Sequence, residues 1–443
     1  MHNTLQMDKR HRHNLGQDDA TAPTQAADAH LTPATSLLDL PTPLLDSIVS
    51  RAMEDGANSA LASTCSILCE RLLLLTPDFR IQLDSKLPTP RIVAALQART
   101  DKLALTLKQP LVESSEQYTA VLAPVLAKLG SCAGVEACTL RCSGSLQTLE
   151  CSPGLAQHLL DSFPNLTALS LYGFSVTNSG LASLLSHPQL DMQLQYLDLT
   201  GTAVREPAKP GEATLPTPFR GVKLTKLKID TYTLSDYIVY CDEDDSDADA
   251  EYIDDVPAWR EALASLQQLQ VLIISDLFCV DGLAELLQAL PQLCTLQLPD
   301  IRVTCEEQLD ELLAATQLMS IQLGEVWRLE TSRADAPCSW QRLEVDLIGA
   351  TYVAYLPLHS LTQPLVLGRL IVDLHPWPRL DMAAVIHNLT HACKVPVIVK
   401  KLRMRKGDTP EALQDQSRYL EQLAAACQLM EVTVEDTGLS SLL

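Results

Sequence analysis

Few residues in this sequence have the types and spacing that catalysis or metal binding requires. His387 and His391 are four residues apart in "MAAVIHNLTHACK", so on a helix they would share one face. With Cys393 they could bind a metal ion, because imidazole and thiolate are common zinc ligands. No glutamate lies between the two histidines to act as the general base of a zinc hydrolase. We therefore expect exposed helix histidines and no metal.

A second candidate is the acidic run "CDEDDSDADAEYIDD" at residues 241–255, which contains nine carboxylates. Carboxylate oxygens suit calcium, but an EF-hand needs a glycine at its turn and a glutamate at its end, and neither is correctly placed here. Such a dense run of like charges repels itself and stays hydrated. We expect a solvated loop, and contact with a basic partner is the alternative.

The thirteen cysteines include no CxxC pair. The densest run, Cys132, Cys138, Cys142 and Cys151, lacks the paired spacing of a structural zinc site. We predict reduced cysteines in an apolar core, within a reducing compartment. The sequence also lacks a glycine-rich phosphate loop, a GxSxG motif and an HExxH motif. It therefore predicts a protein that is not an enzyme and that needs no cofactor.

The elements that would position a binding site form an internal repeat of the phrase apolar-x-x-apolar-x-apolar. Its eleven copies are centred on positions from Cys138 to Val432, at intervals of 22 to 32 residues, except for 45 residues between Leu227 and Leu272. That long interval contains the acidic run. The clear copies are LTALSL (166–171), LQYLDL (194–199), LTKLKI (224–229), LQVLII (269–274), LCTLQL (293–298) and LMSIQL (318–323). The weaker copies are VEACTL (135–140), WQRLEV (340–345), LGRLIV (367–372), VKKLRM (399–404) and LMEVTV (429–434).

Between these phrases the leucine spacing predicts helices, as at 178–187, 280–290 and 306–316. A single strand–helix unit cannot bury its own apolar face, so neighbouring units must stack. The pattern resembles the leucine-rich-repeat family over about residues 100–443, although the family's Asn or Cys after the strand is mostly missing. The resemblance implies an α/β fold, a solenoid with a curved parallel sheet and outer helices. A set of unrelated αβ units is the alternative.

Ahead of the repeats, residues 1–36 are polar and aperiodic and predict a disordered leader. The stretch "LPTPLLDSIV" (40–49) begins a predicted helix, with Thr42 as the N-cap and Pro43 at the first helical position. Two further helical patterns follow, and "TPDFRIQL" (76–83) is a candidate first strand. Residues 37–80 thus predict a compact three-helix unit.

The order of residues in this unit resembles an F-box. Leu40, Pro41, Leu44, Leu45 and Ile48 match its first part, Leu61, Cys65 and Leu72 its middle, and Pro77 with Phe79 its closing phrase. Leu68 stands where the family often has a tryptophan. The resemblance implies that Leu40, Pro41, Leu44, Leu45 and Ile48 bind the adaptor subunit of an SCF-type cullin–RING ubiquitin ligase. The alternative is that these helices only cap the solenoid.

A protein substrate would then bind the concave face of the sheet, where alternate strand residues point outward. The candidate residues are Tyr172, Tyr196, Asp198, Lys226 and Lys228. Near the C-terminus, Lys401, Arg403 and Arg405 in "VKKLRMRK" are a candidate site for an acidic or phosphorylated segment. The alternative is a solvated strand that Glu431 and Glu435 partly neutralise.

Composition limits the remaining functions. The chain has 443 residues, of which 47% are hydrophobic and 20% charged, so it is globular. A net charge of −22 argues against a nucleic-acid binder. No apolar run resembles a signal peptide or a membrane span, so we expect a cytoplasmic or nuclear protein.

The sequence therefore predicts a substrate receptor of an SCF-type ubiquitin ligase. Its solenoid would span residues 81–443, with an acidic insertion at about 235–258. The alternative is a leucine-rich-repeat scaffold outside any ligase.

Overall fold

The computed structural model of the 443-residue chain describes 17 ranges of residues between 78 and 435. They are 78–82, 90–98, 103–109, 117–142, 147–205, 219, 221–230, 262–275, 283–303, 306–326, 329, 331–348, 350–372, 386–387, 389–390, 393–405 and 410–435. The chain divides into two units, Met1–Leu68 and Cys69–Leu443, and every described residue belongs to the second.

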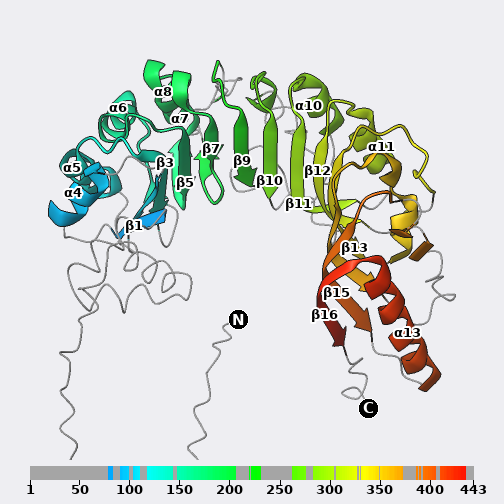
Figure 1. The fold of residues 1–443 in the computed structure, drawn as a ribbon. Helices are drawn as coiled ribbons and strands as arrows, with labels where there is room; N and C mark the ends of the chain where they lie inside the picture. Colours follow the sequence, from blue (N-terminus) through cyan, green and yellow to red (C-terminus); the bar gives the residue numbers. More distant parts are fainter. Residues whose placement is uncertain are drawn as a thin grey trace, which may run out of the picture. The chain divides into compact units, whose positions relative to one another are not determined.

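Within the described ranges the main sheet contains 13 strands, and each neighbouring pair is parallel. The strands stand side by side in the order in which the chain makes them (Figure 1). They are β1 (Asp78–Gln82), β2 (Leu103–Gln109), β3 (Val135–Cys142), β5 (Ala168–Tyr172), β7 (Tyr196–Asp198), β9 (Lys226–Asp230), β10 (Val271–Ser275), β11 (Thr295–Val303), β12 (Ser320–Val326), β13 (Arg342–Ile348), β14 (Leu365–Val372), β15 (Val397–Arg405) and β16 (Gln428–Glu435).

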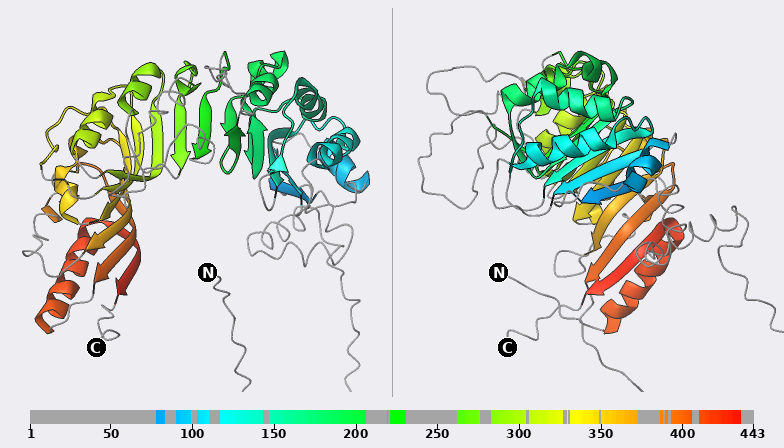
Figure 2. Two further views of the ribbon diagram at one scale, coloured as in Figure 1. Left: turned by 180° about the vertical axis from the view of Figure 1, so that it is seen from behind. Right: turned by 90° about the vertical axis from the view of Figure 1, so that its left-hand side faces the viewer.

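A second, small parallel sheet contains β4 (Gln147–Thr148), β6 (Phe174–Thr177) and β8 (Ala203–Arg205). The helices are α4 (Pro90–Ala98), α5 (Gln117–Leu129), α6 (Pro153–Ser162), α7 (Asn178–Leu185), α8 (Pro188–Gln193), α10 (Leu283–Ala289), α11 (Glu306–Ala314) and α13 (Pro410–Ala426), with 3-10 turns η2 (Ala350–Tyr355) and η3 (Leu358–Ser360). From α4 to α11 the helices follow one side of the row of strands, in front and rear views alike (Figures 1 and 2).

Local sequence explains where several helices begin. The Ser152 hydroxyl accepts a hydrogen bond from the Leu155 backbone N–H at 3.3 Å, and Pro153 occupies the first helical position of α6. Thr177 caps α7 in the same way through the Gly180 N–H, at 3.0 Å. Both caps satisfy backbone donors that have no partner within the helix. Each helix can therefore start directly after the preceding strand or turn.

All eleven predicted phrases form strands of the main sheet, from β3 to β16. The helices predicted near 178–187, 280–290 and 306–316 are confirmed as α7, α10 and α11. The candidate first strand is confirmed as β1, which begins at Asp78. The sequence analysis missed β2 and the small sheet. The strand segments of the small sheet have two to four residues, too few for their periodicity to be recognised.

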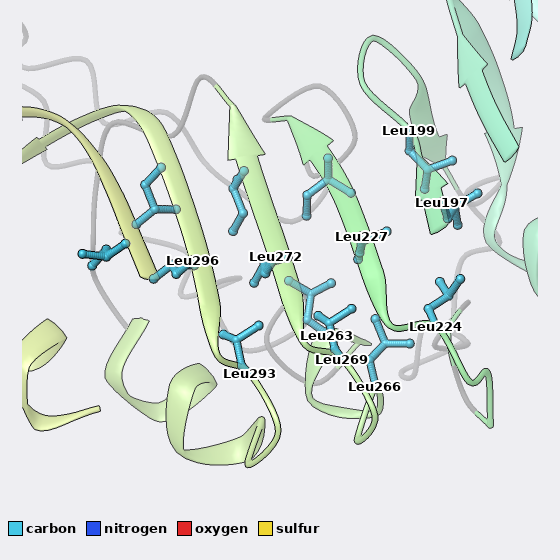
Figure 3. Close-up of a cluster of buried hydrophobic side chains, with 14 of the residues drawn as sticks. Leu197, Leu199, Leu224, Leu227, Leu263, Leu266, Leu269, Leu272, Leu293 and Leu296 are labelled. Carbon is cyan, nitrogen blue, oxygen red and sulfur yellow. The ribbon is translucent and has the colours of Figure 1, made fainter. Parts of the chain in front are cut away.

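The core is a layer of aliphatic side chains between the strands and the helices. Leu197, Leu227, Leu272 and Leu296 lie in this layer on consecutive strands, and each is fully buried (Figure 3). On the helix side they meet leucines such as Leu266, which belongs to the segment before β10. Each strand alone would expose this leucine, so the layer forms only because neighbouring strands stack.

A continuous series of backbone hydrogen bonds joins one repeat to the next. In each of six successive repeats, the residue directly before the strand donates its N–H to the carbonyl of the equivalent residue in the preceding repeat. The donor–acceptor pairs are Gln195–Thr167, Thr225–Gln195, Gln270–Thr225, Cys294–Gln270, Met319–Cys294 and Gln341–Met319, at 2.7–3.0 Å. The same geometry therefore recurs at the interval that the sequence shows, and it persists across the long interval that contains the acidic run.

Several predictions concern residues outside the described ranges. These are the leader (1–36), nearly all of the F-box-like unit (37–80) with Leu40, Pro41, Leu44, Leu45 and Ile48, the acidic insertion at about 235–258, and His391. No described helix is both long enough and apolar enough to cross a bilayer.

Candidate functional site

The face of the main sheet opposite the buried leucines carries the predicted binding residues. On β5, β7 and β10 every other side chain is buried, and the residues between are partly or fully exposed. β9 follows the same alternation as far as Ile229, but its last residue, Asp230, is also buried. Tyr172, Tyr196, Asp198, Lys226 and Lys228 all belong to this exposed set. Strand alternation in the sequence was therefore sufficient to assign their face.

Register brings these five residues and one unexpected arginine together. Tyr196 lies opposite Lys226, and Asp198 lies opposite Lys228. Tyr172 lies opposite Arg141 of β3. We call the resulting group the tyrosine–cation cluster. It consists of Arg141, Tyr172, Tyr196, Asp198, Lys226 and Lys228.

Tyr172 provides an aromatic support for a cation. The guanidinium carbon of Arg141 lies 4.5 Å from the centre of its ring. On the side of β7, Gly201 adopts a φ of +71°, and a Cβ added there would come within 3.0 Å of the same ring. The ring is therefore bordered by Arg141 from one neighbouring strand and by Gly201 from the turn after the other. Such contacts hold the cation in place at a modest energetic gain.

Tyr196 does the same for Lys226, whose ammonium nitrogen lies 4.6 Å from the ring centre. The Tyr196 hydroxyl donates a hydrogen bond to Asp198 Oδ2 at 3.2 Å, and the Lys228 ammonium lies 3.6 Å from the same oxygen. Burial, together with the Asp198 charge and this hydrogen bond, raises the pKa of Tyr196 well above its ordinary value. Tyr196 is thus a neutral hydrogen-bond donor, and Asp198 is held between it and Lys228.

A half-buried apolar pair adjoins the cluster on β10. Val271 lies opposite Lys226, and Ile273 lies opposite Lys228. On the other side of the cluster, the exposed-face positions of β3 and β5 carry small side chains. These are Ala137, Thr139, Ala168 and Ser170. The cations and tyrosines therefore lie next to a surface of small side chains.

Further along the sheet, four charged residues on consecutive strands form a carboxylate–arginine network. Arg369 Nη2 lies 3.2 Å from Glu325 Oε1 and 3.1 Å from Asp346 Oδ2, while Arg302 Nε lies 3.4 Å from Glu325 Oε2. Gly368 makes room for the Asp346 carboxylate, because an added Cβ would overlap it. The charges of this network satisfy one another, so it suits stability better than ligand binding.

Replacing Arg369 with methionine should lower the free energy of unfolding by about 1–2 kcal/mol at pH 7, after allowance for the third of Arg369 that solvent reaches. Burial raises the pKa of Asp346, and Arg369 opposes that rise. Because Asp346 holds its proton more tightly in the folded protein, the free energy of unfolding falls as pH rises from the pKa of Asp346 in the unfolded state to its pKa in the folded state. Removing Arg369 lets the pKa of Asp346 rise further, so the loss should shrink as pH is lowered from 7 to 4 and Asp346 takes up its proton.

Urea unfolding at pH 7 and pH 4 checks this prediction. Arg342→Met is the matched control, because Arg342 is half exposed and lies 3.9 Å from Glu344. Arg342→Met should lower the free energy of unfolding by less than about 0.5 kcal/mol. An equal loss for Arg369→Met at both pH values would show that the side chain acts through packing and not through charge.

The structure does not bring the two predicted groups of cations together. Lys401 and Arg403 are exposed on β15, and the described part of Arg405 is its backbone. Six strand spacings separate β9 from β15, about 29 Å along the sheet. Lys401 lies opposite Glu431 and Arg405 opposite Glu435, which are the acidic neighbours that the alternative interpretation named. The exposed face thus has two distinct basic regions.

The predicted apolar environment of the cysteine run is confirmed. Cys132, Cys138, Cys142 and Cys151 are all buried, and each is a thiol outside any disulfide. Burial raises the pKa of Cys138 and of Cys151 to about 12, so both stay protonated and unreactive at neutral pH. His387 is exposed. Within the described ranges, no three His, Cys, Asp or Glu side chains are placed to hold a metal ion.

The sequence analysis missed Arg141 as a site residue. The phrase that it used for this repeat ended at Leu140, although β3 runs to Cys142. Continuing the alternation from Thr139 by two residues would have placed Arg141 on the exposed face. Its contact with Tyr172 could not be found in this way, because it depends on the register between the two strands.

Comparison of the sequence with protein-family models gives no match, and comparison with curated proteins gives none either.

Proposed function

We propose that the described part of the chain is a leucine-rich-repeat solenoid that binds a protein on the exposed face of its sheet. The observation that carries this proposal is the series of repeat-to-repeat hydrogen bonds, with donors at equivalent positions from Gln195 to Gln341. A set of unrelated αβ units has no reason to reproduce one hydrogen-bond geometry at each step. Repeats of this kind present a long, regular surface of outward strand residues to a partner.

We further propose that the protein is the substrate-recognition subunit of an SCF-type cullin–RING ubiquitin ligase. The support is the F-box-like order of residues in 40–79, directly before a repeat fold. In this role Leu40, Pro41, Leu44, Leu45 and Ile48 bind the adaptor, and the sheet binds the substrate. The receptor contributes no catalytic group; it raises the local concentration of the substrate beside a separate transfer enzyme.

A leucine-rich-repeat scaffold outside any ligase is the second candidate. It is favoured by sequence order: the segment with helical periodicity directly precedes the first strand, β1, and an end repeat needs its open side covered. In a scaffold, Leu44, Leu45 and Ile48 would serve only as core residues of that cap.

The two candidates differ in their response to Leu44→Asp/Ile48→Asp. If these side chains dock the adaptor, two charges in an apolar interface should reduce co-purification of the adaptor at least tenfold, because each lost apolar contact is worth about 1.5–3 kcal/mol. The measurement is pull-down of the purified full-length chain with the recombinant adaptor, followed by immunoblotting. Circular dichroism should show that the variant retains its fold.

The matched control is Met192→Asp/Met319→Asp. Both methionines are exposed, at 73% and 45%, and both belong to the repeats. This control should keep the adaptor at the wild-type level. If folded wild-type protein captures no adaptor, the ligase role is wrong and the scaffold remains.

A further inference from the structure

We infer that the tyrosine–cation cluster binds an extended acidic peptide segment of a partner protein, with carboxylates four residues apart. This inference rests on the proposed role of the exposed sheet face as a protein-binding surface, and it does not depend on adaptor docking. It adds the chemical class of the ligand and the spacing of its charges.

Two cations of the cluster have no anionic partner among the described residues. Within the described ranges, Arg141 and Lys226 form no ion pair, and each lies over a tyrosine ring instead. Lys228, in contrast, is paired with Asp198. In a chain of net charge −22, two supported but unneutralised cations on one face are complementary to an acidic ligand.

The second argument is the direction of the two cations. Arg141 extends from β3 over a ring on β5, and Lys226 extends from β9 over a ring on β7. β5 and β7 are neighbouring strands, so both charges approach the middle of the cluster from its two sides. The tyrosines hold them there before any ligand arrives, which lowers the entropic cost of binding.

The third argument is the spacing. Tyr196 lies opposite Ala168, four residues before Tyr172 on the neighbouring strand. At about 3.3 Å per residue and 4.8 Å between strands, the two rings lie about 14 Å apart. An extended peptide covers about 13 Å in four residues, and its side chains at i and i+4 point to the same side. Carboxylates at these two positions can therefore reach both cations.

The surface between the cations favours a peptide backbone over a bulkier ligand. This surface carries the small side chains of Ser170 and Thr139, and Asp198 lies at its edge. An extended chain can lie over such small side chains, and a neutral residue at i+2 avoids repulsion from Asp198. Val271 and Ile273 on the next strand offer an apolar contact to a residue that follows the acidic pair.

Single-stranded nucleic acid, which also uses aromatic and cationic side chains, fits less well. Base stacking requires a free aromatic face. In the cluster, Arg141 lies over Tyr172 while Gly201 packs against the same ring, and Lys226 lies over Tyr196. The rings are therefore used to support cations.

The test uses the full-length protein and fluorescein-labelled peptides of about ten residues. One peptide carries two glutamates at i and i+4 in a serine–valine background, and the second has the same composition with the glutamates adjacent. Fluorescence anisotropy at low ionic strength should show that the i,i+4 peptide binds several-fold more tightly, because only this spacing engages both cations. Its affinity should fall as salt is added.

Arg141→Gln/Lys226→Gln should weaken binding of the i,i+4 peptide about tenfold, the expected sum of two partly exposed ion pairs. The matched control is Lys128→Gln/Lys394→Gln, which removes the same charge at two exposed lysines outside the cluster. It should change the affinity less than twofold. Tyr172→Leu should also weaken binding, because Arg141 loses its support.

Several results would overturn the inference. These are absence of binding to the wild type, equal affinity for the two peptides, equal effects of the two double variants, or tighter binding of a single-stranded oligonucleotide than of the i,i+4 peptide. Leu44→Asp/Ile48→Asp should bind the peptide normally. Failure of peptide binding and failure of adaptor docking can therefore be told apart.

Discussion

Replacing Leu272 with alanine is expected to lower the free energy of unfolding by about 3 kcal/mol, the usual cost of removing a fully buried leucine side chain. Leu272 is completely buried on β10, and its register partners are Leu227 on β9 and Leu296 on β11. Their side chains occupy one continuous layer (Figure 3). The cavity would therefore open between two strand interfaces at once. Urea denaturation followed by circular dichroism measures the effect.

Ile273→Ala is the matched control, since Ile273 is the next residue and lies on the exposed face. This substitution should lower the free energy of unfolding by about 1 kcal/mol or less. Stacked repeats contact mainly their neighbours, so hydrogen exchange in Leu272→Ala should accelerate most in β9, β10 and β11. Equal losses for the two variants, or uniform acceleration over the described strands, would contradict a stack of repeats with one buried face.

Replacing Gly324 with alanine is expected to destabilise the protein by about 2–3 kcal/mol, within the range found for overpacking. An added Cβ would lie 2.5 Å from the Ile301 carbonyl oxygen, 2.6 Å from the Pro299 carbonyl oxygen and 2.9 Å from the Ile301 nitrogen. These are backbone atoms of β11, which cannot move aside as a flexible side chain could. The two strands would have to separate locally, and thermal or urea unfolding would register the loss.

The close approach of β11 to Gly324 also accounts for the carboxylate–arginine network. The register between β11 and β12 shifts between Leu298 and Arg302, and the intervening backbone of β11 bulges toward Gly324. This shift places Arg302 opposite Glu325. Gly324→Ala should therefore also weaken the contacts of Glu325, and a double-mutant cycle that combines Gly324→Ala with Arg302→Gln would detect the change.

Gly154→Ala is the control for adding a methyl group. Gly154 lies in the first turn of α6, and a Cβ there would be 3.6 Å from the Ser152 hydroxyl oxygen, an ordinary contact. This variant should be neutral or stabilise the protein by up to about 0.5 kcal/mol, because alanine loses less backbone entropy in a helix. If Gly324→Ala behaves like Gly154→Ala, the close approach of β11 and β12 is not a constraint on this fold.

Much of the described fold was predictable from the sequence. The phrase with leucines at alternate positions predicts both a strand and its buried face, because strand side chains alternate between two sides. Leu227 and Leu272 illustrate this: each is the second apolar residue of its phrase, which marks them as equivalent despite the long interval, and both are buried as register partners. The segments between the phrases have helical leucine spacing, which depends only on residues within three or four positions. Such local patterns survive when the repeats are degenerate.

The candidate site was predictable only as a face, and not as a cluster. Lys226, Lys228 and Lys401 were all assigned to exposed positions by alternation, but only the order of strands shows that β9 and β15 are far apart. Arg141 and Tyr172 are separated by 31 residues, and their contact depends on the register of β3 against β5. Aligning the two phrases at Cys138 and Leu169 gives this register, but only the structure shows that the Arg141 and Tyr172 side chains meet.

The sequence by itself determined which residues are buried and which are exposed, since that choice follows from short-range periodicity and the burial of leucine. Only the tertiary structure decided which exposed charges meet. Arg369 on β14 pairs with Asp346 on β13 and with Glu325 on β12. Arg302 lies opposite Glu325 only because the register between β11 and β12 shifts. These contacts arise from the hydrogen-bonded register between neighbouring strands, a property of two segments together that neither segment encodes alone.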